Sequence, residues 1–248
     1  MKQAPKQKTK LGVKDSFILL SKSKYLLSIA MLVLCYGVGI NLIEVVYKSQ
    51  IKLQFPHEND LCAFTGKVSI FTGGVTFIMV SLSANILRFM GWIAAAMITP
   101  VLLYLTGAIF FGFVLFDETL ASFLSFTPLW IAVVVGAAQN ILSKSMKYSL
   151  FDPTKEMAYI PLDLESKVKG KAAIDVVGAR LGKSLGGIVL QVLFLFGSIL
   201  QNLPILFFTV SVIIGLWILS VLSLNRQYTS KLEPEESPSP AALKVETT

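Results

Sequence analysis

The chain has 248 residues, of which 54% are hydrophobic and only 15% are charged. A soluble domain usually carries about 25% charged residues, so this composition argues against a water-soluble globular protein. The net charge of +7 comes from lysines and arginines that flank apolar stretches. Because a nucleic-acid surface interleaves basic and aromatic residues on one folded face, the same distribution argues against nucleic acid as a partner.

Six apolar stretches follow one another along the chain, each near the roughly 20 residues that cross the hydrocarbon core of a bilayer. They cover residues 25–47, 68–87, 90–116, 126–142, 172–200 and 203–224. The pattern predicts an all-α membrane protein, with a six-helix transmembrane bundle over residues 25–224 in contact with the lipid bilayer.

Three polar segments complete the predicted organisation. Residues 1–24 form a basic N-terminal segment that contains seven lysines. Residues 143–171 are predicted as a cytoplasmic loop, in which Asp152 and Pro153 begin a short helix that Pro161 ends. Residues 225–248 are rich in proline and glutamate and are predicted to be a disordered cytoplasmic tail.

The distribution of lysine and arginine predicts the orientation in the membrane. Only Lys48, Lys52 and Lys67 fall on the side opposite the two termini, whereas most of the others lie on the side of the termini. Since cytoplasmic loops carry the excess of basic residues, both termini are predicted to be cytoplasmic. With no cleavable signal before the first stretch, we expect a multi-pass protein of the bacterial inner membrane.

Charged residues inside the apolar stretches are the strongest indication of function. A charge at the centre of a bilayer costs about 2.5–3.5 kcal/mol on insertion scales, so such residues pair with one another or serve a task. Four positions qualify: Glu44, Asp175, Arg180 and Lys183.

The fifth stretch combines two of these charges with a glycine repeat. Arg180, Lys183 and Ser184 share one helical face by their spacing. Gly178, Gly182 and Gly186 recur every four residues on a neighbouring face, a pattern that lets another helix approach closely. The two cations are interpreted either as an anion site in a water-filled cavity or as internal partners of Glu44 or Asp175.

Two other stretches bring polar groups to one helical face each. Asn41, Glu44 and Lys48 do so in the first stretch, where Glu44 either opposes a substrate-binding cation, carries a proton or pairs with Lys48. Asn140 and Lys144 lie at the inner end of the fourth stretch, where an amide either reads a base edge or bonds a neighbouring helix. The sequence contains neither a metal-ligand spacing nor a nucleophile–base set, so neither an enzyme nor a cofactor is expected.

Three long motifs resemble one known family. They are YGVGINLIEVVYKSQIK (36–52), GAAQNILSKSMKYSLFDPTKEMAYIPLD (136–163) and KVKGKAAIDVVGARLGKS (167–184). They resemble the ATP/ADP translocases, the nucleotide transporters of obligate intracellular bacteria and plastids. The resemblance implies a major-facilitator-like fold of twelve helices, exchange of ATP for ADP, and essential charges at the positions of Glu44 and Lys183. Asn41, Lys48, Asn140 and Arg180 match motif positions as well.

The resemblance also implies an incomplete carrier. Six stretches correspond to the C-terminal half of the family's twelve, so an N-terminal six-helix half is expected as a partner. Leu185 departs from the family pattern, in which LGKS is followed directly by two glycines. The alternatives are an importer of other nucleotides or NAD coupled to protons through Glu44, and a half-transporter fragment without transport activity.

Overall fold

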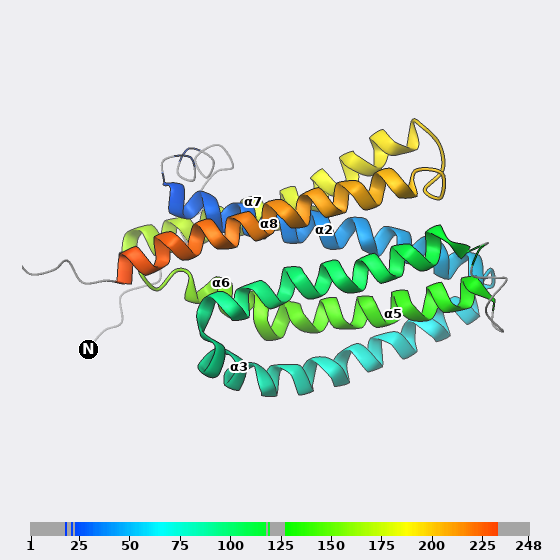
Figure 1. Ribbon diagram of the computed structural model, residues 1–248, viewed down its shortest axis with the longest axis horizontal. Coiled ribbons are helices and arrows are strands. Elements are labelled where there is room, and N and C mark those ends of the chain that lie inside the picture. Colours follow the sequence, from blue (N-terminus) through cyan, green and yellow to red (C-terminus); the bar gives the residue numbers. More distant parts are fainter. Residues whose placement is uncertain (1–17, 19–20, 22, 118, 120–126, 233–248) are drawn as a thin grey trace, which may run out of the picture.

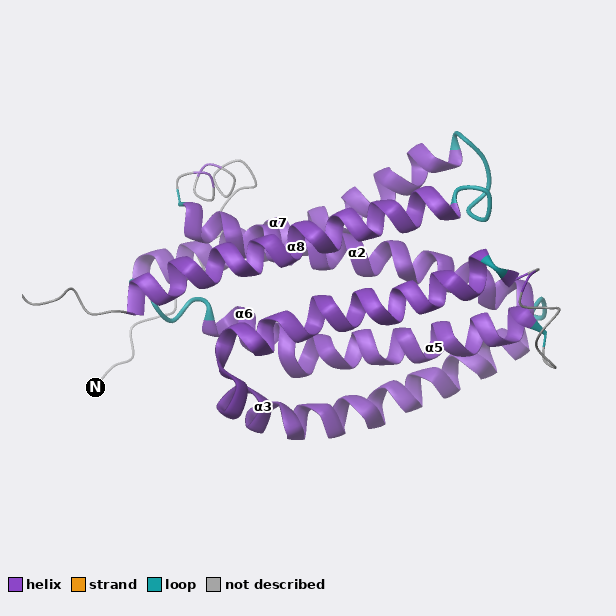
Figure 2. Ribbon diagram, viewed as in Figure 1, coloured by secondary structure: helices purple, strands orange, loops and turns teal. Residues whose placement is uncertain are grey.

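The computed structural model describes residues 18, 21, 23–117, 119 and 127–232, and this part of the chain contains helices and no strands (Figures 1 and 2). The helices, in chain order, are α2 (Lys24–Gln54), α3 (Glu58–Leu115), α5 (Pro128–Met146), the π-helical turn η1 (Lys147–Phe151), α6 (Asp152–Met157), α7 (Leu164–Phe194) and α8 (Leu203–Leu232). The all-helical class predicted from the sequence is confirmed.

Among the described residues, four helices are long and apolar enough to cross a membrane: Lys24–Gln54, Glu58–Leu115, Pro128–Met157 and Leu203–Thr229. They identify a multi-pass membrane protein. In α7, only Ser184–Phe194 forms an apolar helix, of a length below that of a span.

Helix α3 contains two of the predicted stretches, 68–87 and 90–116. A straight helix of its 58 residues would measure about 87 Å, far more than the roughly 30 Å of a bilayer core. The helix reverses at Gly91, whose φ of 73° and ψ of 173° are open to glycine alone. Figure 1 shows the two arms, one before and one after this glycine, running in opposite directions.

The predicted loop 143–171 contains the predicted short helix, since α6 begins at Asp152, but most of the remaining residues are helical as well. Helices α5, η1 and α6 follow one another without a break as far as Met157, and α7 begins at Leu164. Pro153 has no N–H to donate, and the wider π turn directly before it lets the helix continue past this residue. The connection between α6 and α7 is therefore only residues 158–163.

Two other boundaries differ from the prediction or lie outside the described residues. Helix α8 continues to Leu232, so the first part of the predicted tail, 225–232, is helical. Residues 233–248 and nearly all of the predicted segment 1–24 lie outside the described residues.

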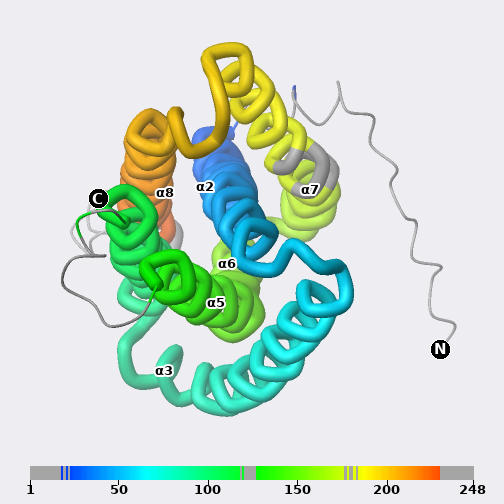
Figure 3. The backbone as a smooth tube through the Cα atoms, turned by 90° about the vertical axis from the view of Figure 1, so that its right-hand side faces the viewer, coloured from blue at the N-terminus to red at the C-terminus, as the bar shows by residue number. Residues whose placement is uncertain are grey.

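Helix α2 occupies the centre of the bundle and packs against α5, α7 and α8 (Figure 3). On one side, the rings of Tyr36 and Phe151 stack with centroids 4.3 Å apart, and each meets the ring of Trp217 edge-on. This aromatic group joins α2, η1 and α8 in the apolar core. It fixes the position of the helical run from α5 to α6 beside α2.

Candidate functional site: a charged cavity beside α2

A cavity of about 550 Å³ lies between α2, the run from α5 to α6, and the middle of α7. Its size falls within the range of small-molecule sites, about 300–1,000 Å³. Its lining is Val33, Tyr36, Gly37, Ile40, Asn41 and Glu44 from α2, Lys144, Lys147, Tyr148, Phe151, Asp152 and Lys155 from α5 to α6, and Ile174, Asp175 and Gly178 from α7.

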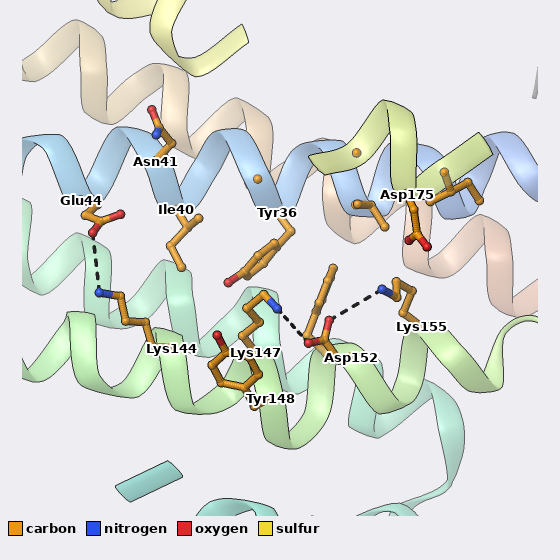
Figure 4. Close-up of a pocket in the computed structure, with 15 residues that line it drawn as sticks. Tyr36, Ile40, Asn41, Glu44, Lys144, Lys147, Tyr148, Asp152, Lys155 and Asp175 are labelled. Carbon is orange, nitrogen blue, oxygen red and sulfur yellow. Dashed lines mark hydrogen bonds and ion pairs between the residues drawn. The ribbon is translucent and has the colours of Figure 1, made fainter. Parts of the chain in front are cut away.

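Two carboxylates in the cavity each contact two lysines, and Figure 4 draws these contacts except the one made by Lys48. An oxygen of Asp152 lies 2.8 Å from Nζ of Lys147, and its other oxygen lies 3.8 Å from Nζ of Lys155. One oxygen of Glu44 lies 3.3 Å from Nζ of Lys48 and 3.6 Å from Nζ of Lys144. The first group belongs to a single helical run, whereas Glu44 and Lys144 connect α2 with α5.

Charge is balanced among the described lining residues. Three lysines, Lys144, Lys147 and Lys155, oppose the carboxylates of Glu44, Asp152 and Asp175. Asp175 enters from α7, and its carboxylate forms no ion pair with any part of the chain that the structure describes. An anion that enters therefore has to compete with carboxylates already present for the lysines.

Aromatic side chains surround these charges. Tyr36 and Phe151 are buried against the core, and they give the cavity an apolar wall. Tyr148 is different, because 55% of this residue is exposed and its ring lies 4.5 Å from Nζ of Lys147, in a cation–π contact. The cavity thus offers cations, carboxylates and an accessible ring within one space.

Four of the site residues predicted from the sequence line this cavity: Asn41, Glu44, Lys144 and Asp175. Lys48 does not line it and reaches it only through Glu44, with 64% of its own side chain exposed.

Of the other predicted site residues, Asn140 and Ser184 do not line the cavity. Asn140 is buried at 4% exposure, and Ser184 is exposed. Arg180 and Lys183 belong to the helical backbone of α7, but their side chains lie outside the described residues.

The predicted glycine repeat of α7 packs against α2. A Cβ atom on Gly182 would lie 3.2 Å from the Cα of Gly37, and one on Gly186 would lie 2.7 Å from the amide oxygen of Asn41. Gly178 faces Val33 in the same way. A side chain at Gly182 would meet the backbone of α2 and push α7 away from it, whereas one at Gly178 or Gly186 would displace the side chain of Val33 or Asn41. The glycines therefore allow the third wall of the cavity to approach closely.

Sequence reasoning missed Lys147, Tyr148, Asp152 and Lys155, because these residues were assigned to a loop. Their spacing contains a usable signal: Lys144 and Lys147 are three residues apart, and Lys155 follows eight residues later. In a continuous helix, residues 144 and 155 are separated by about three full turns and return to the same face.

The sequence is similar to that of known nucleotide carriers. A family model described as "TLC ATP/ADP transporter" matches residues 1–228. "ADP,ATP carrier protein 1" of Chlamydia muridarum is 50% identical over 239 residues, which are 94% of this chain and 45% of the carrier. "ADP,ATP carrier protein 1, chloroplastic" of Arabidopsis thaliana is 49% identical over 235 residues, 93% of this chain and 38% of that protein.

"ADP,ATP carrier protein 3" of Rickettsia bellii is 46% identical over 233 residues, 90% of this chain and 45% of the carrier. The chain thus spans less than half the length of these relatives. No solved structure matches the chain.

Proposed function

Because the chain belongs to the ATP/ADP transporter family, whose model matches residues 1–228, we propose that it forms part of a carrier that exchanges ATP for ADP across a membrane. The carriers of Chlamydia, Rickettsia and Arabidopsis that resemble it are named for ADP and ATP. One observation of the fold supports the proposal: three lysines converge on a cavity large enough for a nucleotide.

In this proposal, the phosphates bind to the lysines of the α5–α6 run. Lys144 and Lys147 approach from one wall, and Arg180 and Lys183 add charge from α7. Arginine supplies a forked pair of donors and lysine a point charge, both suited to phosphate oxygens. A low-dielectric cavity strengthens each of these contacts relative to bulk water.

The carboxylates serve the empty state of the carrier. Glu44 neutralises Lys144 when no phosphate is present, and Asp175 does the same for Arg180 or Lys183 of α7. Asn41 positions substrate from α2, while Lys48 acts through Glu44. We assign no substrate contact to Asn140 or Ser184, since neither lines the cavity in this half.

The proposed architecture is one half of a twelve-helix, major-facilitator-like carrier. The two arms of α3 supply two spans, and α2, the α5–α6 run, α7 and α8 supply four more. An N-terminal six-helix half closes the cavity from the opposite side, and alternating access arises when the two halves rock against each other. Both termini are placed in the cytoplasm and the bundle in the bacterial inner membrane, as the basic residues predict.

The test is uptake of labelled ATP into bacteria preloaded with ADP. The chain is expressed together with the part of the Chlamydia muridarum carrier that it does not match, because one half supplies only one wall. We expect uptake that depends on internal ADP and that falls strongly in Lys183→Ala. Undiminished uptake in that variant would refute the phosphate role of Lys183, and no uptake in any form would refute the transport proposal.

The same assay separates the alternative cargoes. Inhibition by unlabelled ATP and ADP, but not by other nucleotides or NAD, supports the exchanger. Uptake that follows a proton gradient and is lost in Glu44→Gln would instead support proton-coupled import of another nucleotide.

A further inference from the structure

We propose that Asp152 is the carboxylate that a substrate phosphate displaces from Lys147 and Lys155, and that it limits how strongly the cavity prefers nucleotides with more phosphates. This inference deepens the proposed function and rests on it. It concerns a residue that faces two cations at once, from within the same helical run.

The geometry makes Asp152 a substitute for a phosphate group. Its two oxygens contact two different ammonium groups, at 2.8 Å for Lys147 and 3.8 Å for Lys155 (Figure 4). A phosphate also presents several oxygens that accept from lysine, and at greater negative charge. The carboxylate is 31% exposed, so water and a ligand in the cavity can reach it.

Both lysines have a second contact that remains when Asp152 is displaced. Nζ of Lys147 also lies 4.5 Å from the ring centroid of Tyr148. Nζ of Lys155 lies 3.9 Å from a carboxylate oxygen of Glu156, which does not line the cavity. The two ammonium groups therefore stay in place while they exchange one anion for another.

The charge balance of the cavity turns this exchange into selectivity. Among the described lining residues, three lysines already face three carboxylates, and every carboxylate that remains near the ligand repels it. This repulsion grows with the charge of the ligand, and it is therefore larger for ATP than for ADP and larger for ADP than for AMP. Neutralising Asp152 should strengthen binding in the same order.

The experiment measures how well unlabelled AMP, ADP and ATP inhibit uptake of labelled ATP by the assembled carrier. In Asp152→Asn, we expect the half-inhibitory concentration of each nucleotide to fall relative to the wild type. The fall should be larger by a factor on the order of five for each added phosphate charge, so it is smallest for AMP and largest for ATP. An equal change for all three nucleotides, or weaker inhibition by ATP, would overturn the inference. If wild-type uptake responds to none of the three, the proposed function fails and this inference fails with it.

A double substitution guards against a purely structural effect. Lys147→Gln alone removes a cation and should have the opposite effect. Inhibition should weaken for all three nucleotides, and most strongly for ATP. Lys147→Gln combined with Asp152→Asn restores the charge balance, and the relative inhibition by AMP, ADP and ATP should return close to that of the wild type. If Asp152→Asn is not found in the membrane, Asp152→Ser is measured instead. Its inhibition must also strengthen progressively from AMP to ADP to ATP.

The matched control is Glu165→Gln. It also neutralises one carboxylate near the same end of the bundle, but that side chain is 72% exposed and lies away from the cavity. We expect its inhibition series to equal that of the wild type. If inhibition in Glu165→Gln strengthened from AMP to ATP as much as in Asp152→Asn, net charge alone would be responsible, and the assignment to Asp152 would be overturned.

Discussion

Two neighbouring sides of α2, one residue apart in the helical repeat, differ in what they contact. Positions 33, 37 and 41 contact the glycines of α7, where a Cβ on Gly37 would lie 3.2 Å from the backbone of Gly182, although these positions also border the cavity. Positions 36, 40 and 44 face the cavity, across which Glu44 and Lys144 approach to 3.6 Å. The first side is closed by backbone contact with α7, whereas the second is open to the cavity and carries the charged side chain of Glu44.

This difference separates stability from function within one helix. On the closed side, added volume has no space and forces the helices apart. On the open side, partly exposed ion pairs contribute at most about 1 kcal/mol to stability, so these charges are retained for what they bind. Substitutions on the closed side should therefore lower the stability of the protein, and substitutions on the open side should lower its affinity for the substrate.

The largest loss of stability is expected for Gly182→Leu. Its side chain would enter the backbone of α2, and overpacking of this kind costs about 1–3 kcal/mol. Gly187→Leu is the control, because a Cβ at Gly187 meets nothing within 4 Å. Thermal unfolding of the detergent-solubilised protein compares them. Equal melting temperatures for the two variants would contradict close packing at Gly182.

A loss of binding with little loss of stability is expected for Lys144→Gln. A hydrogen bond to a charged group contributes on the order of 1.5 kcal/mol or more, so ATP should bind about tenfold more weakly. Lys48→Gln is the matched variant, since Lys48 contacts the same oxygen of Glu44 but does not line the cavity. Competition with labelled ATP measures both. A larger loss in Lys48→Gln would place the substrate elsewhere.

The smallest effect is expected at the start of α7, the helix that bears the glycines. The backbone N–H of Ser166 donates to the carboxylate of Asp163 at 3.0 Å and lowers the pKa of this carboxyl below its usual value. A lowered pKa means that the contribution to stability is present above the unfolded pKa of about 4 and is lost as the pH falls through the folded pKa.

Asp163→Ala should consequently lower the melting temperature slightly at pH 7, and the difference from the wild type should shrink at pH 3. Asp163→Asn keeps an oxygen that accepts a hydrogen bond from the helix, so its melting temperature should lie between those of Asp163→Ala and the wild type. A difference between Asp163→Ala and the wild type that is the same at both pH values would show that the carboxylate charge does not stabilise this helix end.

Much of the fold could be predicted from the sequence, because long apolar stretches have few alternatives. The stretch beginning at residue 25 became α2, and the glycines at 178, 182 and 186 pack against another helix, as their spacing indicates. The separate stretches 68–87 and 90–116 predicted a break close to Gly91, where α3 reverses, but the φ of this glycine could not be inferred from composition.

The site was predicted only in part. Glu44, Lys144 and Asp175 stood out as charges within or at the end of apolar stretches, whereas Asp152 and Lys155 fell in a polar segment. A proline there was interpreted as a helix start, but the π turn before it joins α6 to α5 and brings both residues to the cavity. This turn packs against α3 and, through the ring of Phe151, against Tyr36 of α2, and local sequence does not specify such contacts.

The most direct test of a nucleotide in this cavity is protection of a single cysteine. Ile40 lines the cavity from α2, so Ile40→Cys is made in the assembled carrier with Cys35 and Cys62 replaced by serine and exposed to a thiol reagent. Glu165→Cys, at an exposed position outside the cavity, is the control. We predict that ATP and ADP slow the labelling of Ile40→Cys and leave that of Glu165→Cys unchanged. Labelling of Ile40→Cys at the same rate with and without nucleotide would contradict binding between α2, α5–α6 and α7.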